Sequence, residues 1–467
     1  MKKVFTLVFS LVTVFVNAQL LSTSPAFIQE SSTPIVITAD ATKGNQGLKD
    51  YATTTDVYVH IGAITTKSVN PSDWKYLPFT SFTSTTAAAN CAYLGNNKWS
   101  FTINGGLRSF FNITDPGESV RKIAILFRSG NGSKKLANAD GSDMYLTVYD
   151  ANLNVRIDLP PSQPLFTPIA EPLTKVVGDA ITITANANQA STIKLFFNGT
   201  LLSTTPSATT ATTSVNITAT GNQQIIAEAT AGASVKADTL QFVVASPNTV
   251  AALPSGLKDG INYDVNDNTA ATLVLYAPNK GNVFVVGDFN NWAQSSQYQM
   301  NVTPDGFRYW IKLTGLVAAT EYAFQYIIDG NLKVADYTTE KVLDPFNDQY
   351  IPATTYPNLK PYPIGKTSGI VSVLQTAKPA YNWQIPNFSK PDKRNLIIYE
   401  LLVRDFTAAQ NWKTTKDTLS YLKRLGINAI ELMPVNEFEG NNSWGYNGSF
   451  FFAPDKAYGT DVAFKEF

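Results

Sequence analysis

The feature that most constrains the fold is a change of hydrophobic pattern near residue 395. Residues 396–403 form a nearly continuous apolar run of strand length, and residues 429–433 form a second one. Such runs are typical of parallel strands covered on both faces. Between them, leucines recur every three residues up to Gly426, which predicts a helix capped at Thr414 or Thr415 with the glycine at C′. A strand, a helix and a strand within about forty residues predict a βαβ unit with a right-handed crossover.

The chain before residue 395 has the two-residue period of β-strands. In residues 56–61, for example, Val57, Val59 and Ile61 share one face, as a half-buried strand requires. Asn198-Gly199 lies between two such segments and is a strong signal for a two-residue hairpin. We therefore predict a mainly β fold: β-sandwich domains (Ig-like or E-set) at residues 26–158, 168–246 and 250–355, a linker at 356–392, and the βαβ portion at 393–467.

Residues 1–18 have the features of a secretory signal peptide. Lys2 and Lys3 precede an apolar run that extends to Val16, and Ala18 ends a small-residue cleavage site. The run is too short for a membrane span, although an uncleaved anchor is the alternative. We therefore expect an exported protein, whether periplasmic, cell-surface or secreted. Cys91 is the only cysteine, so no intrachain disulfide is expected.

Composition restricts the class of partner. The chain has 36 basic and 36 acidic residues without a block of like charges, which argues against nucleic acid or an anionic membrane surface. Aromatic residues make up 12% of the chain. Aromatic rings suit sugar binding because the C–H face of a pyranose stacks on them, although most aromatic residues fill cores. His60, the only histidine, has no partner for a metal site and is expected to be structural or solvent-facing.

Residues 250–355 carry an ordered set of motifs. A strand at 273–276 is followed by Gly287-Asp288-Phe289-Asn290-Asn291-Trp292, by strands containing Trp310 and residues 322–328 with a hairpin at Asp329-Gly330, and by Asp344-Pro345. In that order they resemble a family 48 carbohydrate-binding module. The resemblance makes Trp292 and Trp310 candidate sugar-binding residues. The alternative is that this domain is a structural collar in which the tryptophan is packed.

The residues after each predicted strand of the βαβ unit favour one kind of parallel fold. Tyr399–Thr407 closes the first strand, Leu425–Phe438 spans the second, and Trp444-Gly445-Tyr446 leads to Tyr458-Gly459. This series resembles the start of the TIM (β/α)8 barrel of glycoside hydrolase family 13, the α-amylase family. Active-site groups of such barrels lie on loops after the strands. The resemblance implies that Tyr446 stacks on a glucose ring of the substrate, and that Trp444 packs the loop; the alternative is that Tyr446 merely fills the mouth of the barrel.

The resemblance implies a retaining mechanism, which needs two carboxylates about 5 Å apart. The candidates after the first two strands are Asp405, Glu437, Glu439 and Asp455. Glu437 and Glu439 alternate around Phe438 and would share a face in extended backbone, but a loop rich in Asn and Gly does not offer the burial that separates two pKa values. We therefore expect no catalytic residue within this chain, and none that ligates metal. A TIM barrel takes about 250 residues, of which about 75 are present, so we expect a fragment that hydrolyses nothing by itself.

The sequence thus predicts the N-terminal part of an exported, α-glucan-active hydrolase of the α-amylase type, acting on starch or glycogen. A 1,4-α-glucan branching enzyme is an alternative. An alternative of another class is a non-catalytic starch-binding protein. The expected partner is an α-glucan polysaccharide, with no nucleic acid and no membrane span. No cofactor is required by the sequence, and calcium is the one that the full-length enzyme could bind.

Overall fold

The computed structural model describes residues 20–69, 72–139, 141–161, 173–385 and 387–467. The predicted signal peptide and the first residues of the predicted second domain lie outside this part of the chain. Strands make up 40% of the structure and helices 10%, which confirms the mainly β prediction. The described residues fall into two compact units, one that ends at Asn154 and one that begins at Val155. Among the described residues, no helix is both long and apolar enough to cross a membrane.

Two sheets share one core in the first unit. The apolar face predicted for residues 56–61 is buried, and it packs with Trp99 and Ile125 in that core. His60 lies on the other face, where it stacks on Trp74 and meets the edge of Phe82. Burial, together with the charge of Arg128, lowers the pKa of His60, and the packing of its ring against Trp74 and Phe82 agrees with a structural role. The strand order in the first sheet is β1 (Leu21–Ser24), β2 (Ile35–Asp40), β5 (Lys98–Ile103), β4 (Ala92–Gly95). In the second sheet the order is β3 (Val57–Thr65), β6 (Val120–Ser129), β7 (Lys135–Leu136), and β8 (Met144–Thr147) also pairs with β6. The short helices are η1 (Ala87–Ala89) and α1 (Leu107–Phe110).

The predicted Ig-like spacer is a single five-stranded sheet in the described residues. Two strands predicted at 181–185 and 193–197 form one strand, β10 (Ala180–Phe197), because the backbone stays extended through a bulge between them. The hairpin at Asn198-Gly199 is confirmed, with positive φ at both residues. An Ig-like domain has two sheets, so the structure differs from the prediction. The other strands are β9 (Val155–Leu159), β11 (Thr200–Asn216), β12 (Gly221–Ala231) and β13 (Ser234–Val244).

The third domain has two sheets and extends further than predicted. β22 (Val371–Gln375) pairs with β19 (Glu321–Ile328) and β21 (Val342–Leu343), so residues predicted as linker complete this domain. The loop between β19 and β20 (Leu332–Val334) has three residues rather than the predicted two. The first sheet contains β14 (Gly260–Tyr263), β15 (Ala271–Tyr276), β18 (Arg308–Leu313) and β17 (Asn301–Val302), and β16 (Val283–Gly287) borders β19 in the second. Three short helices occur, η2 (Asp288–Asn290), η3 (Ser296–Tyr298) and η4 (Asp348–Tyr350).

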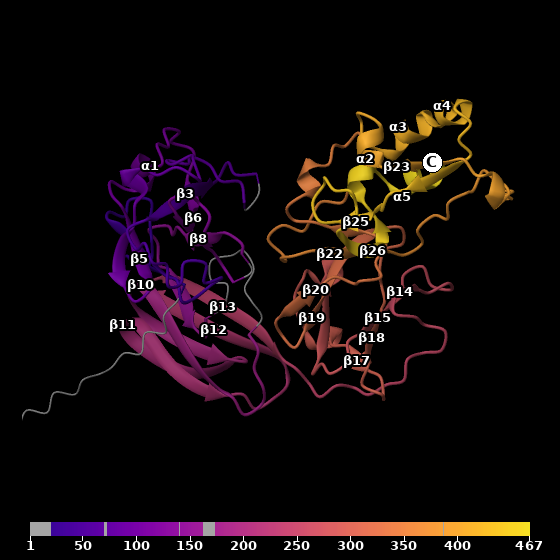
Figure 1. The fold of residues 1–467 in the computed structure, drawn as a ribbon. Helices are drawn as coiled ribbons and strands as arrows, with labels where there is room; N and C mark the ends of the chain where they lie inside the picture. The colour runs from indigo at the N-terminus through magenta and orange to yellow at the C-terminus, as the bar shows by residue number, and fades with distance from the viewer. Residues whose placement is uncertain (1–19, 70–71, 140, 162–172, 386) are drawn as a thin grey trace, which may run out of the picture. The chain divides into compact units, whose positions relative to one another are not determined.

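The last part of the chain contains the predicted βαβ unit. β23 (Ile398–Leu401) and β24 (Ala429–Leu432) pair in parallel, with helices between them (Figure 1). Gly426 has a φ of +86°, as predicted for C′, but the N-cap is Asn411, whose side chain accepts from the backbone N–H of Thr414. η5 (Lys393–Asn395) precedes β23, and the helices between the two strands are α2 (Val403–Phe406), α3 (Trp412–Asp417) and α4 (Leu419–Arg424). An antiparallel hairpin of β25 (Asn436–Phe438) and β26 (Gly448–Pro454) follows, then η6 (Lys456–Tyr458) and α5 (Asp461–Glu466).

Candidate functional site

The loop between β25 and β26, residues 439–447, presents aromatic side chains to solvent. Tyr446 is 69% exposed and Trp444 is 62% exposed, so Trp444 does not pack the loop as predicted. Gly445 lies between them with a φ of +88°, and a Cβ atom there would lie 2.1 Å from the carbonyl oxygen of Pro434. The backbone of the loop is therefore pressed against the chain that leaves β24, which directs the two flanking rings outward. We refer to residues 439–447 as the aromatic loop.

Two hydrogen bonds attach the aromatic loop to neighbouring segments. Asn441 Nδ2 donates to the backbone carbonyl of Asn347 at 2.7 Å, and Arg404 Nη1 donates to Asn442 Oδ1 at 2.9 Å. Asn347 belongs to the preceding β domain, whereas Arg404 follows β23. The loop is thus fixed both to the βαβ unit and to the domain before it.

A buried charged cluster holds the base of this hairpin. Lys456, directly after β26, forms ion pairs with Glu437 on β25 and, at 3.3 Å, with Asp348 of the preceding domain. The carboxylate of Asp455 accepts from the backbone N–H of Phe438 at 3.1 Å and from that of Ala457 at 2.8 Å. All four charged side chains are buried. The cluster therefore joins the two strands of the hairpin to each other and to the domain before them.

One ammonium group faces three carboxyl groups in this cluster. Burial is the main cause of a pKa of about 8 at Glu437 and about 6 at Asp455, and it also raises the pKa of Asp348. Burial alone would lower the pKa of Lys456, but the charges of Glu437 and Asp348 outweigh it and raise that pKa. At neutral pH we infer a charged Lys456 and at least one protonated carboxyl group.

The carboxylates considered from the sequence do not form an exposed pair. β25 ends at Phe438, so the alternation does not continue: Glu437 is buried on Lys456 whereas Glu439 is exposed. Asp405 is paired with Arg404 at 2.7 Å, which lowers the pKa of its carboxyl group. Sequence reasoning missed Lys456 and Asp348. The sequence signal for Lys456 was its position next to Asp455, just after an apolar strand. No such signal exists for Asp348, which lies too far away in the sequence to be paired with Lys456 by pattern.

The two candidate tryptophans of the third domain are both half-buried. Trp292 Nε1 donates to Asp288 Oδ1 at 2.9 Å, and the ring packs against two apolar clusters that include Phe284 and Val371. Trp310 Nε1 donates to the backbone carbonyl of Ala251 at 3.0 Å. The structure does not bring either ring together with the aromatic loop. Among the described residues, no group of three or more His, Cys, Asp or Glu side chains is placed to hold a metal ion.

Fold and site together define a class: a protein of β-rich domains followed by a parallel βαβ unit that presents an aromatic loop. No family model matches the chain. The chain is similar to the malto-oligosyltrehalose trehalohydrolase of Saccharolobus solfataricus, with 30% identity over 143 residues, which cover 31% of this chain and 21% of that protein. It is also similar to the 1,4-α-glucan branching enzyme of Cupriavidus pinatubonensis, with 30% identity over 207 residues, 41% of this chain and 26% of that protein.

Among solved structures, a pullulanase from Bacillus acidopullulyticus aligns over 94% of this chain and 51% of its own, with 13% identity and a TM-score of 0.33. The trehalohydrolase and the branching enzyme both belong to glycoside hydrolase family 13, the α-amylase family, and the resemblance predicted from the sequence is confirmed. The matched residues span only 13% to 28% of the lengths of the curated relatives.

Proposed function

We propose that the chain is the N-terminal part of an exported, retaining α-glucan hydrolase of the α-amylase type, which acts on starch or glycogen. The observation that carries the proposal is the aromatic loop, in which Tyr446 is exposed on a backbone fixed at both Asn441 and Asn442. An exposed ring on an anchored loop can stack on the C–H face of a glucose unit at a lower cost in conformational entropy than a ring on a free loop. The relatives, whose names give malto-oligosyltrehalose and 1,4-α-glucan as the molecules they act on, support this class of ligand.

The proposal places the catalytic carboxylates outside residues 393–467. A retaining pair needs two carboxyl groups about 5 Å apart, one of them free to attack the sugar. Glu437 and Asp455 are buried in the cluster around Lys456, where they neither face solvent nor reach a bound glucan. Their raised pKa values therefore reflect a structural cluster, which is a common cause of such shifts outside active sites.

Two other functions are weighed against hydrolysis. A branching enzyme is supported by the similarity to 1,4-α-glucan branching enzymes, but the predicted signal peptide favours a hydrolase because branching serves intracellular glycogen. A non-catalytic glucan-binding protein is favoured by the β-rich domains that precede the aromatic loop. All three functions share an α-glucan ligand, so binding is the property to test first.

The test is retention of the purified chain in an amylopectin-containing native gel. We expect retention of the chain, and about a tenfold weaker affinity for Tyr446→Ala, which corresponds to about 1.4 kcal/mol. Tyr421→Ala is the matched control, since Tyr421 is an exposed tyrosine on α4 of the same unit. Equal retention of Tyr446→Ala and the unsubstituted chain would refute the role of the loop. Release of reducing sugar from starch above an empty-vector control would refute the placement of the carboxylates.

A further inference from the structure

The segment Asp344–Tyr350 lies directly against the aromatic loop. Asn347 accepts the hydrogen bond from Asn441, and Asp348 pairs with Lys456 at 3.3 Å. Asn441 and Trp444 are three residues apart, so their Cα atoms are separated by at most about 11 Å. Side chains next to Asn347 are therefore close enough to act on the same extended ligand as the aromatic loop.

The same segment presents two aromatic rings to solvent. Phe346 is 67% exposed and Tyr350 is 72% exposed, comparable to Trp444 and Tyr446. Single exposed aromatic residues are common and need no explanation. Here, however, the two exposed rings flank Asn347 and Asp348, the residues that hold the aromatic loop.

The backbone of this segment is held in place by its own side chains. Asp344 accepts from the backbone N–H of Phe346 at 2.7 Å and from the side-chain amide of Asn347 at 2.8 Å. Asp348 accepts from the backbone N–H of Asp344 at 3.0 Å, and Gln349 Nε2 donates to the carbonyl of Phe346 at 3.0 Å. The positions from which both rings project are thus fixed, which lowers the entropic cost of binding a ligand to them.

We propose that Phe346 and Tyr350 form a second sugar-binding platform that continues the platform of the aromatic loop. The ligand is the same α-glucan chain, whose outer glucose units stack on these rings while an inner unit lies on Tyr446. This inference rests on the proposed glucan-binding function. Through this second platform, the third β domain contributes to the selectivity for long glucan chains, although its residues are far in sequence from the βαβ unit.

The proposal predicts an effect that depends on ligand length. A short oligosaccharide fills only the platform at Tyr446, whereas a long one also reaches Phe346 and Tyr350. We expect the double substitution Phe346→Ala and Tyr350→Ala to weaken binding of maltoheptaose about tenfold and to leave binding of maltotriose within about twofold.

The experiment is titration calorimetry of the full chain with maltotriose and with maltoheptaose. Phe307→Ala is the matched control, because Phe307 is an exposed aromatic residue of the same domain whose ring packs edge-on against Tyr276. Circular dichroism checks that each variant is folded. The proposal is overturned if the double variant binds maltoheptaose as tightly as the unsubstituted chain, or if it loses affinity equally for both oligosaccharides.

The titrations separate this inference from the function on which it rests. If Tyr446→Ala loses affinity for both oligosaccharides while the double variant loses none, only the second platform is wrong. If the unsubstituted chain binds neither oligosaccharide, the proposed function and the second platform are both wrong.

Discussion

Removal of the ammonium group of Lys456 should destabilise the hairpin that carries the aromatic loop, and more so at high pH. Lys456 is the only cation paired with the buried carboxyl groups of Glu437 and Asp348 among the described residues. Lys456→Met keeps much of the volume and removes the charge. Loss of one partner of a buried ion pair typically costs about 3–5 kcal/mol, because the other charge is left uncompensated.

The pKa values of the cluster set the dependence on pH. A carboxyl group in the variant can avoid an unpaired charge by binding a proton. Glu437, with a pKa of about 8, is already protonated at pH 5 and partly protonated at pH 8 in the unsubstituted chain. Asp455, with a pKa of about 6, is ionised at pH 8, so its protonation costs about 3 kcal/mol at pH 8 and almost nothing at pH 5, at about 1.4 kcal/mol per pH unit. We therefore expect a loss of about 2–3 kcal/mol at pH 8 and of about 1 kcal/mol or less at pH 5.

The unsubstituted chain should show a related dependence. The pKa of Glu437 is raised from 4.5 to about 8 in the folded state. Between pH 4.5 and pH 8, the folded chain therefore binds more protons than the unfolded chain. The contribution of Glu437 to stability therefore falls as the pH rises through this window. Lys456 affects stability in a different pH range. Because its pKa is raised in the folded state, its contribution to stability is lost only at alkaline pH.

Hydrogen exchange of peptides within residues 436–458 measures the free energy of local opening, which suits a chain of several domains better than global unfolding. The control is Lys413→Met, since Lys413 forms an exposed pair with Asp417 at 3.2 Å and should have no measurable effect on these peptides. Equal losses for Lys456→Met at pH 5 and pH 8, or a loss below about 1 kcal/mol at pH 8, would refute the reasoning.

Two further predictions concern the aromatic loop and the third domain. Gly445→Ala should displace the aromatic loop and abolish retention in amylopectin gels, because its Cβ would meet the carbonyl of Pro434; Gly426→Ala, with a similar φ but open space, should cost only about 1–2 kcal/mol and keep retention. Trp292→Ala should destabilise the third domain by about 2 kcal/mol, measured by calorimetry, since the ring is packed and hydrogen-bonded. A lower affinity for glucan with an unchanged thermal transition would instead identify Trp292 as a sugar platform.

Local patterns in the sequence predict those elements whose partners are close along the chain. The parallel pair β23 and β24, the turn at Asn198-Gly199 and the C′ glycine Gly426 all follow from residue type and spacing. The N-cap of α3 was misassigned because Asn411 and the threonines that follow it are all good caps, and only the backbone geometry selects among them.

Features that depend on distant partners could not be predicted in this way. β22 is short and stands between Pro-rich and irregular segments, and its strand character is decided by its pairing with β19 and β21. The candidate site shows the same limit. Tyr446 can be identified as a candidate from the sequence of its loop. The position of that loop, however, depends on Asn347 and Asp348, about a hundred residues earlier.

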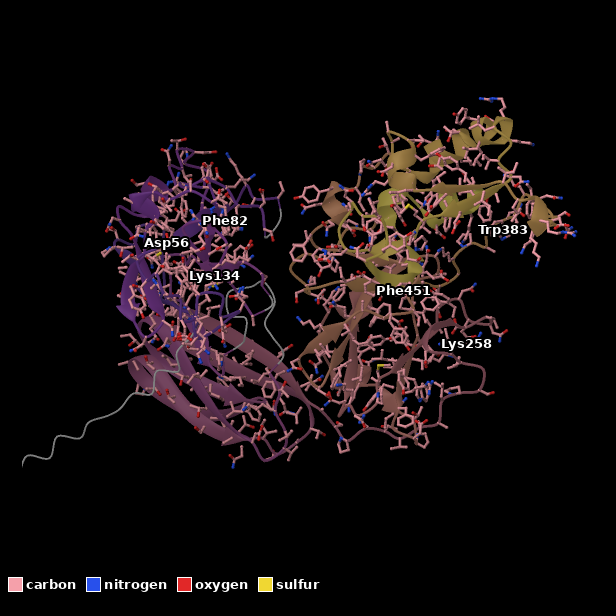
Figure 2. The ribbon with its side chains drawn as sticks, in the orientation of Figure 1. Asp56, Phe82, Lys134, Lys258, Trp383 and Phe451 are labelled. Atoms are coloured by element: carbon pink, nitrogen blue, oxygen red, sulfur yellow. The ribbon has the colours of Figure 1, made fainter. Side chains whose placement is uncertain are left out.

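The pairing of β21 with β22 has a consequence for the segment between them. Leu343 lies opposite Val371 in this ladder, so residues 344–370 leave the sheet and re-enter it at neighbouring positions, and they form a closed loop. Chain entropy is lost when such a loop closes during folding, before any ligand arrives. Phe346 and Tyr350 are therefore preorganised, whereas Phe451 on the exposed face of β26 (Figure 2) belongs to a hairpin that depends on the Lys456 cluster. If the proposed second platform is correct, a change that opened the β21–β22 ladder would weaken glucan binding although it altered none of the residues proposed to contact the sugar.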